Sequence, residues 1–396
     1  MTDLTQSPTE PAFVQDPYPF YRAAREQGPI HHWTDYGIRC AFSHAAVSHC
    51  LRDRRFGREA PPECAPAIPD RLRPFYDIEA HSMLELEPPR HTRLRRLVLA
   101  AFTSRRIAEM GPEIAALARD LATALPRDGT AFDLIPAFAN RLPIAVICRL
   151  LGVPEEMSDQ LLRWSNDMVA MYQARRTPEI EAAACDAATA FSDFLRSYVE
   201  ERRSRPADDL LTQLIAAEED GEALSTDELI STCILLLNAG HEATVHTIGN
   251  GVKLLLDHGH GPEVLTPDTV DGTVEEILRH DPPLHMFTRW AYEDIDVMGH
   301  QFRRGDRVGL MLAAANRDPR VWEDPDRFDP TRPVRPNTSF GAGLHFCIGA
   351  PLARLELRIA LPVLFEHHPG LRIAEPPAYA DLYHFHGLDS LVLASG

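Results

Sequence analysis

Cys347 lies in a glycine-rich segment whose composition suits a thiolate that binds a metal centre. Residues 340–349 read Phe-Gly-Ala-Gly-Leu-His-Phe-Cys-Ile-Gly, and a helical pattern begins directly after them. Glycines let the backbone turn tightly and direct N–H groups toward one sulfur, and the positive end of the following helix favours thiolate over thiol. A lone cysteine ligand suits haem iron better than zinc, which takes several protein ligands. The alternative is that Cys347 is only a buried residue of a glycine-rich turn.

The segment resembles the haem-binding loop of the cytochrome P-450 family, in particular its soluble bacterial members. That loop reads Phe-Gly-x-Gly-x-His/Arg-x-Cys-x-Gly, and every fixed position is matched here. The resemblance implies a mainly α fold with small β-sheets, in which a helical prism holds haem under a long central helix, as one domain over residues 1–396. It also implies haem b as the cofactor, with Cys347 as the axial iron ligand and Phe340, Gly341, His345 and Gly349 in the cofactor loop.

A long helix is predicted from Ser225 to about Asp257. It opens with a capping box formed by Ser225 and Glu228, and about 33 residues at 1.5 Å each would span roughly 50 Å. In its middle, the small residues Ala239 and Gly240 open a groove that could take a planar cofactor or a diatomic ligand. The alternative at Gly240 is close packing against another helix. Strand-like stretches include residues 30–33, 38–42 and 308–312.

The oxygen-binding motif of the family, Ala/Gly-Gly-x-Asp/Glu-Thr, is incomplete in this helix. Ala239, Gly240 and Glu242 match, but Ala243 stands where the family has threonine. Alanine cannot relay a proton, and Thr244 lies about 100° further round the helix. Three routes stay open: the substrate supplies the hydroxyl, ordered water supplies it, or the enzyme leaks or uses peroxide. Glu242 is a candidate proton relay, with a structural role as the alternative.

Glu276 and Arg279 stand at i and i+3 and can pair on one helix face. Such a pair is commonplace, but Asp-Pro-Pro follows it at 281–283, and the arrangement resembles the Glu-x-x-Arg signature of the family. Residues 316–329 resemble its meander loop. The resemblance implies that Arg327 joins Glu276 and Arg279 in a buried network that supports the cysteine loop, a structural role.

His91 and Arg95 stand at i and i+4, so both side chains face the same way, as two donors gripping an anion would. By resemblance that anion is a haem propionate, with Arg289 and His345 as further donors. The alternative is a basic, solvated helix face.

The resemblance places a substrate pocket along residues 71–84, residues 164–180, the central helix and two later segments. Its candidate contacts are Met83, Leu84, Leu235, Asn238, Leu284, His285, Met286, His384 and Phe385. Three of these are polar, Asn238, His285 and His384, which suggests an oxygenated substrate such as a polyketide, terpenoid or substituted aromatic. Each polar side chain could instead bond its own backbone or water.

Composition narrows the functional classes. The chain has 396 residues and a formal net charge of -18, which argues against nucleic acid and anionic membranes as partners. No apolar run approaches the roughly 18–20 residues of a spanning helix. The seven cysteines are scattered without a CxxC pair, as expected in a reducing cytoplasm.

The motifs occur in the family's order between residues 85 and 358, which implies a haem monooxygenase that inserts one oxygen atom from O2 into a small organic substrate by hydroxylation, epoxidation or dealkylation. We see no flavin or ferredoxin module in the sequence, so electrons are expected from a separate ferredoxin and its NAD(P)H-dependent reductase. A basic patch could steer an acidic ferredoxin: Arg93, Arg96, Arg105, Arg106, Arg354 and Arg358. The alternatives are a peroxide-driven peroxygenase and a haem protein that binds a ligand without oxidising it.

Overall fold

The computed structural model describes residues 2–173, 176–219 and 222–396. The chain divides into two compact units, which we describe separately. The first comprises Met1–Cys64, Pro112–Asn140 and Ala243–Gly396, and the second comprises Ala65–Gly111 and Arg141–Glu242. That all 396 residues act as one domain stays a prediction.

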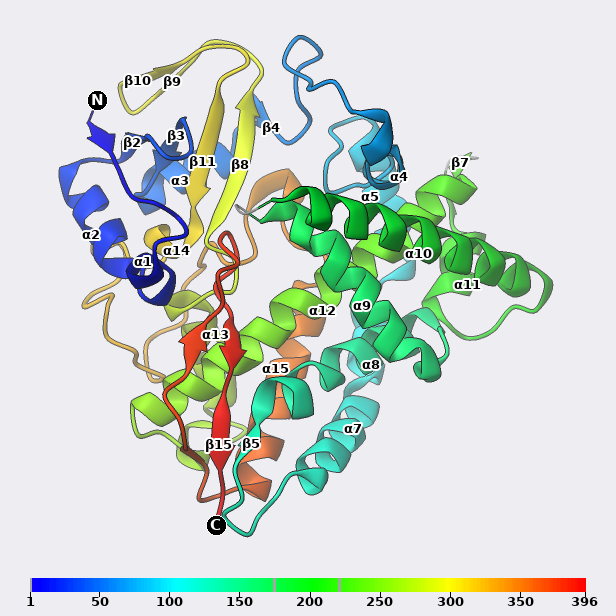
Figure 1. The fold of residues 1–396 in the computed structure, drawn as a ribbon, viewed down its shortest axis with the longest axis vertical. Coiled ribbons are helices and arrows are strands. Elements are labelled where there is room, and N and C mark those ends of the chain that lie inside the picture. Colours follow the sequence, from blue (N-terminus) through cyan, green and yellow to red (C-terminus); the bar gives the residue numbers. More distant parts are fainter. Residues whose placement is uncertain (1, 174–175, 220–221) are drawn as a thin grey trace. The chain divides into compact units, whose positions relative to one another are not determined.

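The first unit contains a six-stranded sheet, drawn mainly in blue and yellow in Figure 1. Its strands, in spatial order, are β1 (Asp3–Leu4), β2 (Ile30–Trp33), β3 (Ile38–Ala41), β11 (Arg307–Met311), β8 (Met286–Ala291) and β4 (Phe56–Gly57). Strands β1 and β2 pair in parallel, as do β3 and β11, and the other neighbours are antiparallel. Ile30 from β2 and Val308 and Leu310 from β11 lie in one buried apolar cluster.

Helices and short strands complete the first unit. The helices are α1 (Pro11–Gln15), α2 (Tyr18–Gln27), α3 (His44–Arg52), most of α7 (Gly111–Ala124), α13 (Val270–His280), α14 (Leu312–Ala315) and α15 (Ala350–His367). The strands are β9 (Ile295–Val297) with β10 (His300–Phe302), β12 (Arg372–Ile373) with β15 (Val392–Ala394) and β5 (Phe132–Asp133), and β13 (Ala378–Tyr379) with β14 (Leu388–Ser390). Strand β15, red in Figure 1, runs beside β5. An antiparallel bridge between Leu284 and Phe385 brings the C-terminal segment to the start of β8.

The second unit is helical apart from one short hairpin. Its helices are α4 (Arg73–Glu79), α5 (Arg90–Ala101), α6 (Ser104–Glu109), α8 (Arg141–Leu151), α9 (Ser158–Val169), α10 (Pro178–Ser204) and α11 (Leu210–Ala216), and β6 (Glu218–Glu219) pairs with β7 (Glu222–Ala223). Helices α9 and α10 pack along each other, with Trp164 against Phe191 at 5.4 Å between ring centroids.

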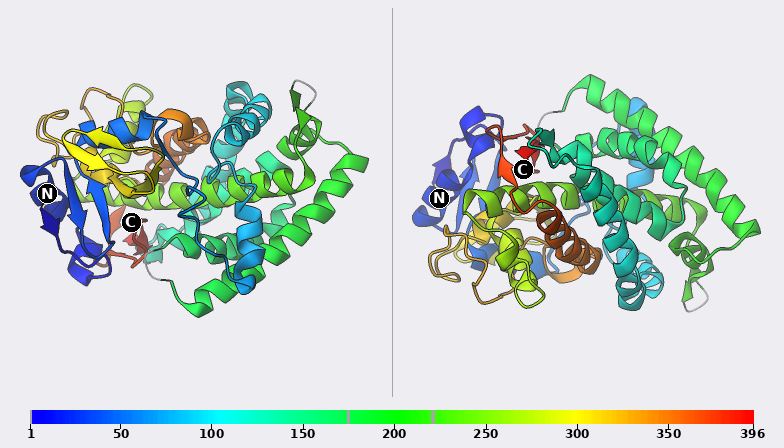
Figure 2. Two further views of the ribbon diagram at one scale, coloured as in Figure 1. Left: turned by 90° about the horizontal axis from the view of Figure 1, so that it is seen from above. Right: turned by 90° about the horizontal axis from the view of Figure 1, so that it is seen from below.

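The predicted long helix is confirmed as α12 (Thr226–Asp257), which runs without a break in both views of Figure 2. Its capping box is present as well. The Ser225 N–H donates to Glu228 Oε2 (2.9 Å), and the Glu228 N–H donates to Ser225 Oγ (3.2 Å). These two bonds satisfy N–H groups that a helix start otherwise leaves without partners.

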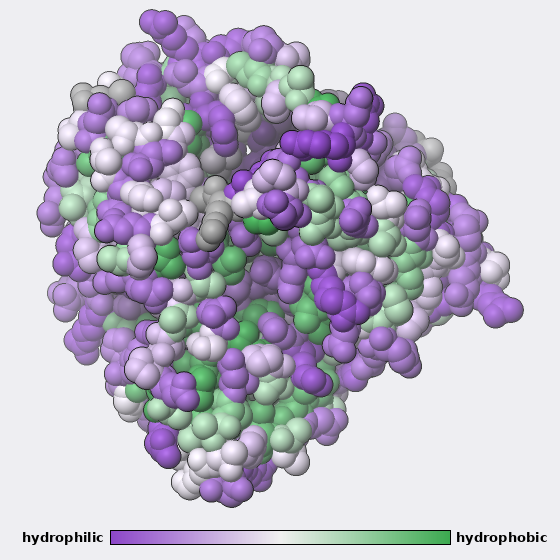
Figure 3. All heavy atoms as spheres, viewed as in Figure 1, coloured by the Kyte–Doolittle hydropathy of each residue, from purple (hydrophilic) through white to green (hydrophobic). Residues whose placement is uncertain are grey.

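Hydrophilic residues are spread over the face shown in Figure 3, between smaller apolar areas. Among the described residues, no helix combines the length and the apolar character that crossing a membrane requires.

Candidate active site

The loop that carries Cys347 is a tight turn built on two glycines. Gly341 and Gly343 have φ of 68° and 69°, in the left-handed region that favours glycine. The Gly341 N–H donates to the Thr338 carbonyl (2.8 Å), and the Cys347 N–H donates to the Phe340 carbonyl (3.0 Å). Among the described residues Cys347 is the exposed cysteine, whereas the other six are buried or half-buried. The turn therefore presents one thiol at the surface of the first unit.

Helix α15 begins three residues after Cys347. Pro351 stands in its first turn, where a missing N–H costs little, and the Ala353 N–H donates to the Gly349 carbonyl (3.0 Å). A Cβ placed on Gly349 would lie 3.8 Å from Cys347 Sγ, so the sulfur is next to the start of the helix. The positive end of the helix dipole favours the thiolate at this place.

Side chains from α13 and α15 hold the loop in place. The Arg354 guanidinium lies 4.5 Å from the centre of the Phe340 ring. Its Nε forms an ion pair with Glu275 Oε1, and its Nη2 donates to Glu275 Oε2 (3.2 Å). The first residue of the loop is thus tied through one arginine to α13.

Glu276 and Arg279 form the buried pair that their spacing predicts. Arg279 Nε and Nη2 donate to the two oxygens of Glu276, both at 2.7 Å. Arg279 Nη1 also donates to the Asn316 carbonyl (3.0 Å). Asn316 in turn bonds Thr338 and Ser339, directly before the cysteine loop. The network therefore reaches the loop through Asn316.

The prediction that the Arg327 side chain joins this network is wrong. Its side chain is 67% exposed and lies 3.9 Å from Asp329, and only its backbone carbonyl accepts a bond from Arg279. The guanidinium that reaches Glu276 belongs to Arg332, whose Nε lies 3.3 Å from Oε1 and whose side chain is 12% exposed. Arg332 stays inside because it also donates to three backbone carbonyls of residues 323–327.

One face of α12 is partly open. Ala239 is exposed, and Leu235, Glu242 and Ala243 are half-buried, whereas most residues around them are buried. Residues 235, 239, 242 and 243 are separated by four, three and one positions, so all four lie on one side of the helix. Gly240 points elsewhere: a Cβ there would lie 3.4 Å from Ile147 Cδ1, which is the packing role considered as the alternative.

Two threonines near Ala243 do not replace the missing hydroxyl on that face. Thr244 is buried, unlike half-buried Ala243. Thr247 Oγ1 donates to the Ala243 carbonyl (2.7 Å). The hydroxyl of Thr247 is therefore already engaged by the backbone.

The predicted anion donors lie in both units. In the second, His91 is buried and Arg95 is half-buried, one turn apart on α5. In the first, Arg289 is buried on β8, and its Nη1 donates to the Thr288 carbonyl (2.8 Å). His345 lies half-buried in a 3-10 turn at Gly343–His345, within the cysteine loop. Their role toward haem stays a prediction.

In the second unit, the two predicted pocket segments contact each other. Tyr172 Oη donates to Glu79 Oε2 (2.7 Å), and Arg176 Nη1 donates to Tyr76 Oη (3.1 Å). Residues 174 and 175 of the 164–180 segment lie outside the described residues. Met83 is buried and Leu84 half-buried in the same unit.

Asn238 is a buried amide on α12. Its Nδ2 lies 3.9 Å from Met168 Sδ, a weak acceptor. No described residue donates to its Oδ1. The amide therefore has hydrogen-bonding capacity to spare.

In the first unit, the remaining pocket candidates gather where residues 383–386 meet the start of β8. Leu284 and Phe385 form an antiparallel bridge, and the His285 N–H donates to the His384 carbonyl (2.9 Å). Burial and the charge of Arg307 lower the pKa of His384 to about 4. Met286 is buried against the aromatic residues of α1 and α2.

The arginines of the predicted basic patch are mostly neutralised by acidic neighbours. Arg105 pairs with Glu109, Arg106 with Asp208 and Arg358 with Asp271. Arg93 pairs with Glu228, and Arg354 with Glu275 as described above. Their net positive field is therefore weaker than the sequence suggests.

Sequence reasoning missed Asn316 and Arg332 as supports of the loop. Asn316 stands in the segment that resembles the meander loop, which was a usable signal. For Arg332 no local motif exists, because its partners are backbone carbonyls and one distant carboxylate.

Comparisons with known proteins show the family and the fold. A family model described as Cytochrome P450 matches residues 70–264 and 269–368. The chain is 38% identical over 375 residues to the Vitamin D(3) 25-hydroxylase of Pseudonocardia autotrophica, covering 91% of this chain and 89% of that one. It is 35% identical over 388 residues to the polyketide biosynthesis cytochrome P450 PksS of Bacillus subtilis (strain 168), covering 95% and 94%. The crystal structure of P450BioI with an acyl carrier protein ligated to hexadec-9Z-enoic acid matches with a TM-score of 0.91 and 33% identity, covering 98% and 99%.

Proposed function

The chain belongs to the cytochrome P450 family, and from that premise we propose that Cys347 ligates the haem iron and that a separate ferredoxin feeds the enzyme with electrons. The enzyme is a haem-thiolate monooxygenase that inserts one oxygen atom from O2 into a small organic substrate. Haem b, when bound, supplies the activation of dioxygen. The residues of this chain hold the cofactor, position the substrate and deliver protons.

The residues present fit haem b. The observation that carries the assignment is the exposed Cys347 thiol, set in a left-handed glycine turn at the start of α15. By the family's motif, the small and exposed residue Ala239 of α12 would leave room for a flat cofactor. Phe340, Gly341, His345 and Gly349 would line the thiolate side, and His91, Arg95 and Arg289 would bind the propionates.

We propose an oxygenated substrate of secondary metabolism, such as a polyketide. The polyketide biosynthesis relative PksS supports this class. So does Asn238, because its buried Oδ1 can accept a hydrogen bond from a ligand hydroxyl. The apolar contacts would come from Met83, Leu84, Leu235, Leu284, Met286 and Phe385, with His384 as a second polar contact.

Proton delivery is the feature in which this chain departs from its family. Ala243 offers no hydroxyl, and that of Thr247 is engaged by the Ala243 carbonyl. We therefore propose that ordered water or a substrate hydroxyl takes the place of the threonine, with half-buried Glu242 as the carboxylate that exchanges protons.

Peroxide-driven oxygenation is the second candidate, and Ala243 is the observation that favours it. The two hypotheses differ in what the enzyme needs for turnover. A monooxygenase fed by ferredoxin forms product with ferredoxin, reductase and NAD(P)H. A peroxygenase forms product with peroxide alone, at a rate comparable to that of the ferredoxin system.

The proposal is tested first by titrating the ferric holoenzyme with a panel of oxygenated compounds while following the haem absorption band. Displacement of water from the iron identifies a compound class, which is then tested for turnover with ferredoxin or peroxide. Cys347→Ser is expected to abolish the thiolate-haem spectrum, and Cys40→Ser, which alters a buried cysteine, is the control. A thiolate-haem spectrum that survives Cys347→Ser would overturn the ligand assignment.

Asn238→Leu tests the substrate class separately. Leucine has nearly the same shape but no amide, so a hydroxylated ligand should bind about fivefold more weakly, as expected for one hydrogen bond of about 1 kcal/mol. The matched ligand without that hydroxyl should bind the unaltered protein and Asn238→Leu with the same affinity. Equal loss for both ligands would remove Asn238 from the polar contacts.

A further inference from the structure

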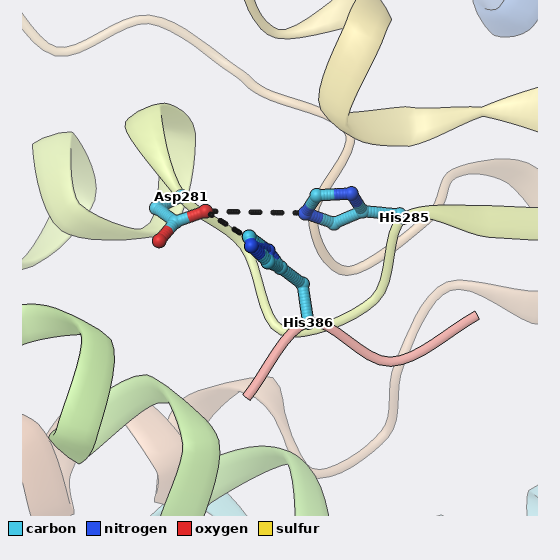
Figure 4. Close-up of side chains that lie close together, drawn as sticks. All are labelled: Asp281, His285 and His386. Atoms are coloured by element: carbon cyan, nitrogen blue, oxygen red, sulfur yellow. Dashed lines mark ion pairs between the residues drawn. The ribbon is translucent and has the colours of Figure 1, made fainter. Parts of the chain in front are cut away.

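Asp281, His285 and His386 converge on one another inside the first unit, as Figure 4 shows. Asp281 follows the end of α13, His285 directly precedes β8, and His386 lies in the C-terminal segment. Asp281 Oδ1 is 3.9 Å from His285 Nε2 and 3.8 Å from His386 Nδ1. One ligand atom from each residue can be chosen so that all three lie within 4.8 Å of one another. All three residues are at most 4% exposed.

The imidazole nitrogens in this cluster have hydrogen-bonding capacity that the protein does not use. Both ring nitrogens of His386 are buried, and no described residue forms a hydrogen bond with them. Unsatisfied buried polar atoms are uncommon and require an explanation such as a bound ion or water. An imidazole nitrogen without a proton offers a lone pair to a metal ion or to another donor.

Hydrogen bonds from outside the cluster already orient two of its members. Tyr21 Oη lies 3.0 Å from His285 Nδ1 and bonds Tyr383 Oη at 2.8 Å. When Nδ1 carries the proton, Nε2 is left as the lone-pair nitrogen that faces Asp281. Tyr18 Oη donates to Asp281 Oδ1 (2.6 Å), and Tyr379 Oη donates to Oδ2 (2.7 Å). Metal-ligating histidines and carboxylates are commonly held by such outer bonds.

We propose that Asp281, His285 and His386 bind a divalent transition-metal ion, with zinc as the first candidate. Two imidazoles and one carboxylate, with an open fourth position, form a known type of zinc ligand set. Ligand atoms about 2.0–2.1 Å from zinc lie roughly 3.3–3.5 Å apart in tetrahedral or trigonal geometry. Asp281 Oδ1 lies 3.9 and 3.8 Å from the two histidine nitrogens, and the three ligand atoms lie within 4.8 Å of one another. Side-chain rotations would therefore bring the three atoms closer together when the ion binds.

The surrounding charges are mixed. The positive charge of Arg317 repels a bound cation. This charge is partly balanced, because Arg317 Nη1 lies 3.5 Å from Asp326 Oδ1 and its Nη2 donates to the His280 carbonyl (2.8 Å). His246 faces His386 from α12, and Asp16 adds negative charge from outside the cluster. The nearest formal negative charge is Asp281, so a divalent ion with one carboxylate would leave a net positive site, as in other zinc sites with two histidines and one acidic ligand.

A bound ion would join the segment at residues 281–285 to the C-terminal segment at His386, about 100 residues later in the sequence. His285 and His386 flank the bridge between Leu284 and Phe385, both proposed substrate contacts. The ion would therefore fix the C-terminal part of the proposed pocket without touching the reaction itself. The binding of zinc does not depend on the proposed function, because haem and zinc are measured separately.

The test is the zinc content of tag-free holoenzyme, stripped with a chelator and then dialysed against buffered Zn2+. We expect one zinc per protein chain in the unaltered protein. Asp281→Asn and His386→Gln should each weaken zinc binding at least about 100-fold, since even outer-layer changes cost 10- to 100-fold. His368→Gln, which alters a buried histidine elsewhere, should retain the zinc.

Folding of each variant is checked by its haem-thiolate spectrum. Tyr21→Phe provides a variant that keeps all three ligands: it should bind zinc about 10- to 100-fold more weakly but still reach one equivalent. Zinc should also raise the unfolding temperature of the unaltered protein and of His368→Gln, but not that of His386→Gln. The proposal would be overturned if the unaltered protein bound no more zinc than His386→Gln. It would also be overturned if His368→Gln lost as much zinc as His386→Gln.

Discussion

Asn316 accepts two hydrogen bonds from Thr338 through the same oxygen, one from the backbone N–H and one from the hydroxyl, both at 2.8 Å. The amide nitrogen of Asn316 donates to Ser339 Oγ (2.8 Å). These three bonds join the buried Glu276–Arg279 pair to the residues that enter the Cys347 loop. One amide side chain therefore connects this buried pair to the loop that carries the proposed iron ligand.

Asn316→Ala should destabilise the loop more than the rest of the protein. It leaves the buried Thr338 and Ser339 groups without this partner, at a cost of about 1–3 kcal/mol per unsatisfied group. We expect a lower unfolding free energy and partial loss of the thiolate-haem spectrum. Asn166→Ala, at an exposed position on α9, is the control and should change neither quantity. An unchanged spectrum in Asn316→Ala would show that the loop holds its shape without this contact.

Arg332 and Arg327 form a matched pair that tests the corrected network. Arg332→Ala removes a guanidinium that bonds Glu276 and three backbone carbonyls. The free energy of unfolding should therefore fall by about 2–4 kcal/mol. Arg327→Ala removes a side chain that is 67% exposed and should stay within about 0.5 kcal/mol of the unaltered protein. Denaturant unfolding measures both, and the reverse order would restore the assignment made from sequence.

Sequence patterns predicted the features that depend on neighbours along the chain. The capping box of α12, the Glu276–Arg279 pair and the turn at Gly341 follow from spacings of a few residues. Patterns failed where partners are distant, as with Arg332, whose place near Glu276 depends on how residues 323–332 fold back. The strand β8 was not predicted either, because its polar residues Thr288 and Arg289 interrupt the apolar pattern of a central strand.

The candidate site was predictable to the same extent. The identity of Cys347 as the exposed cysteine follows from its motif, but the Asp281, His285 and His386 cluster could not be predicted. Two of its members stand four residues apart and the third is about 100 residues away. Only the pairing of residues 283–285 with residues 384–386 brings them together.

Alanine variants of Gly343 and Gly37 distinguish the cost of an unfavourable backbone conformation from the cost of a steric collision. Both have positive φ, but a Cβ on Gly343 would collide with the Leu51 carbonyl of α3, whereas none of the atoms around Gly37 lies within 4 Å. Gly37→Ala should cost about 1–2 kcal/mol from backbone conformation alone. Gly343→Ala should cost more and should also reduce haem incorporation. The two variants are compared by denaturant unfolding and haem content, and equal losses would mean that α3 yields to the added methyl.

His368 should make the folded state less stable in acid. Burial lowers its pKa below the ordinary value of 6.5, and its Nε2 lies 2.9 Å from the Ala122 carbonyl. Below pH 6.5 the unfolded chain therefore binds a proton that the folded chain does not, so stability falls as the pH falls. His368→Gln should flatten this slope in unfolding measured at pH 7 and below. Asn166→Ala, at an exposed position on α9, removes no titratable group and should leave the slope unchanged.

Ala243→Thr restores the hydroxyl that the family motif contains, and Ala243→Val adds nearly the same shape without it. If ordered water now carries the protons, the threonine variant should convert more of the supplied electrons into product and release less peroxide, because a positioned hydroxyl donates more reliably. The valine variant should show no such gain. If a substrate hydroxyl occupies this space, both variants should lower turnover and weaken substrate binding. Product yield per NAD(P)H and peroxide release distinguish these cases, and identical behaviour of the two variants with unchanged peroxide release would remove Ala243 from the proton path.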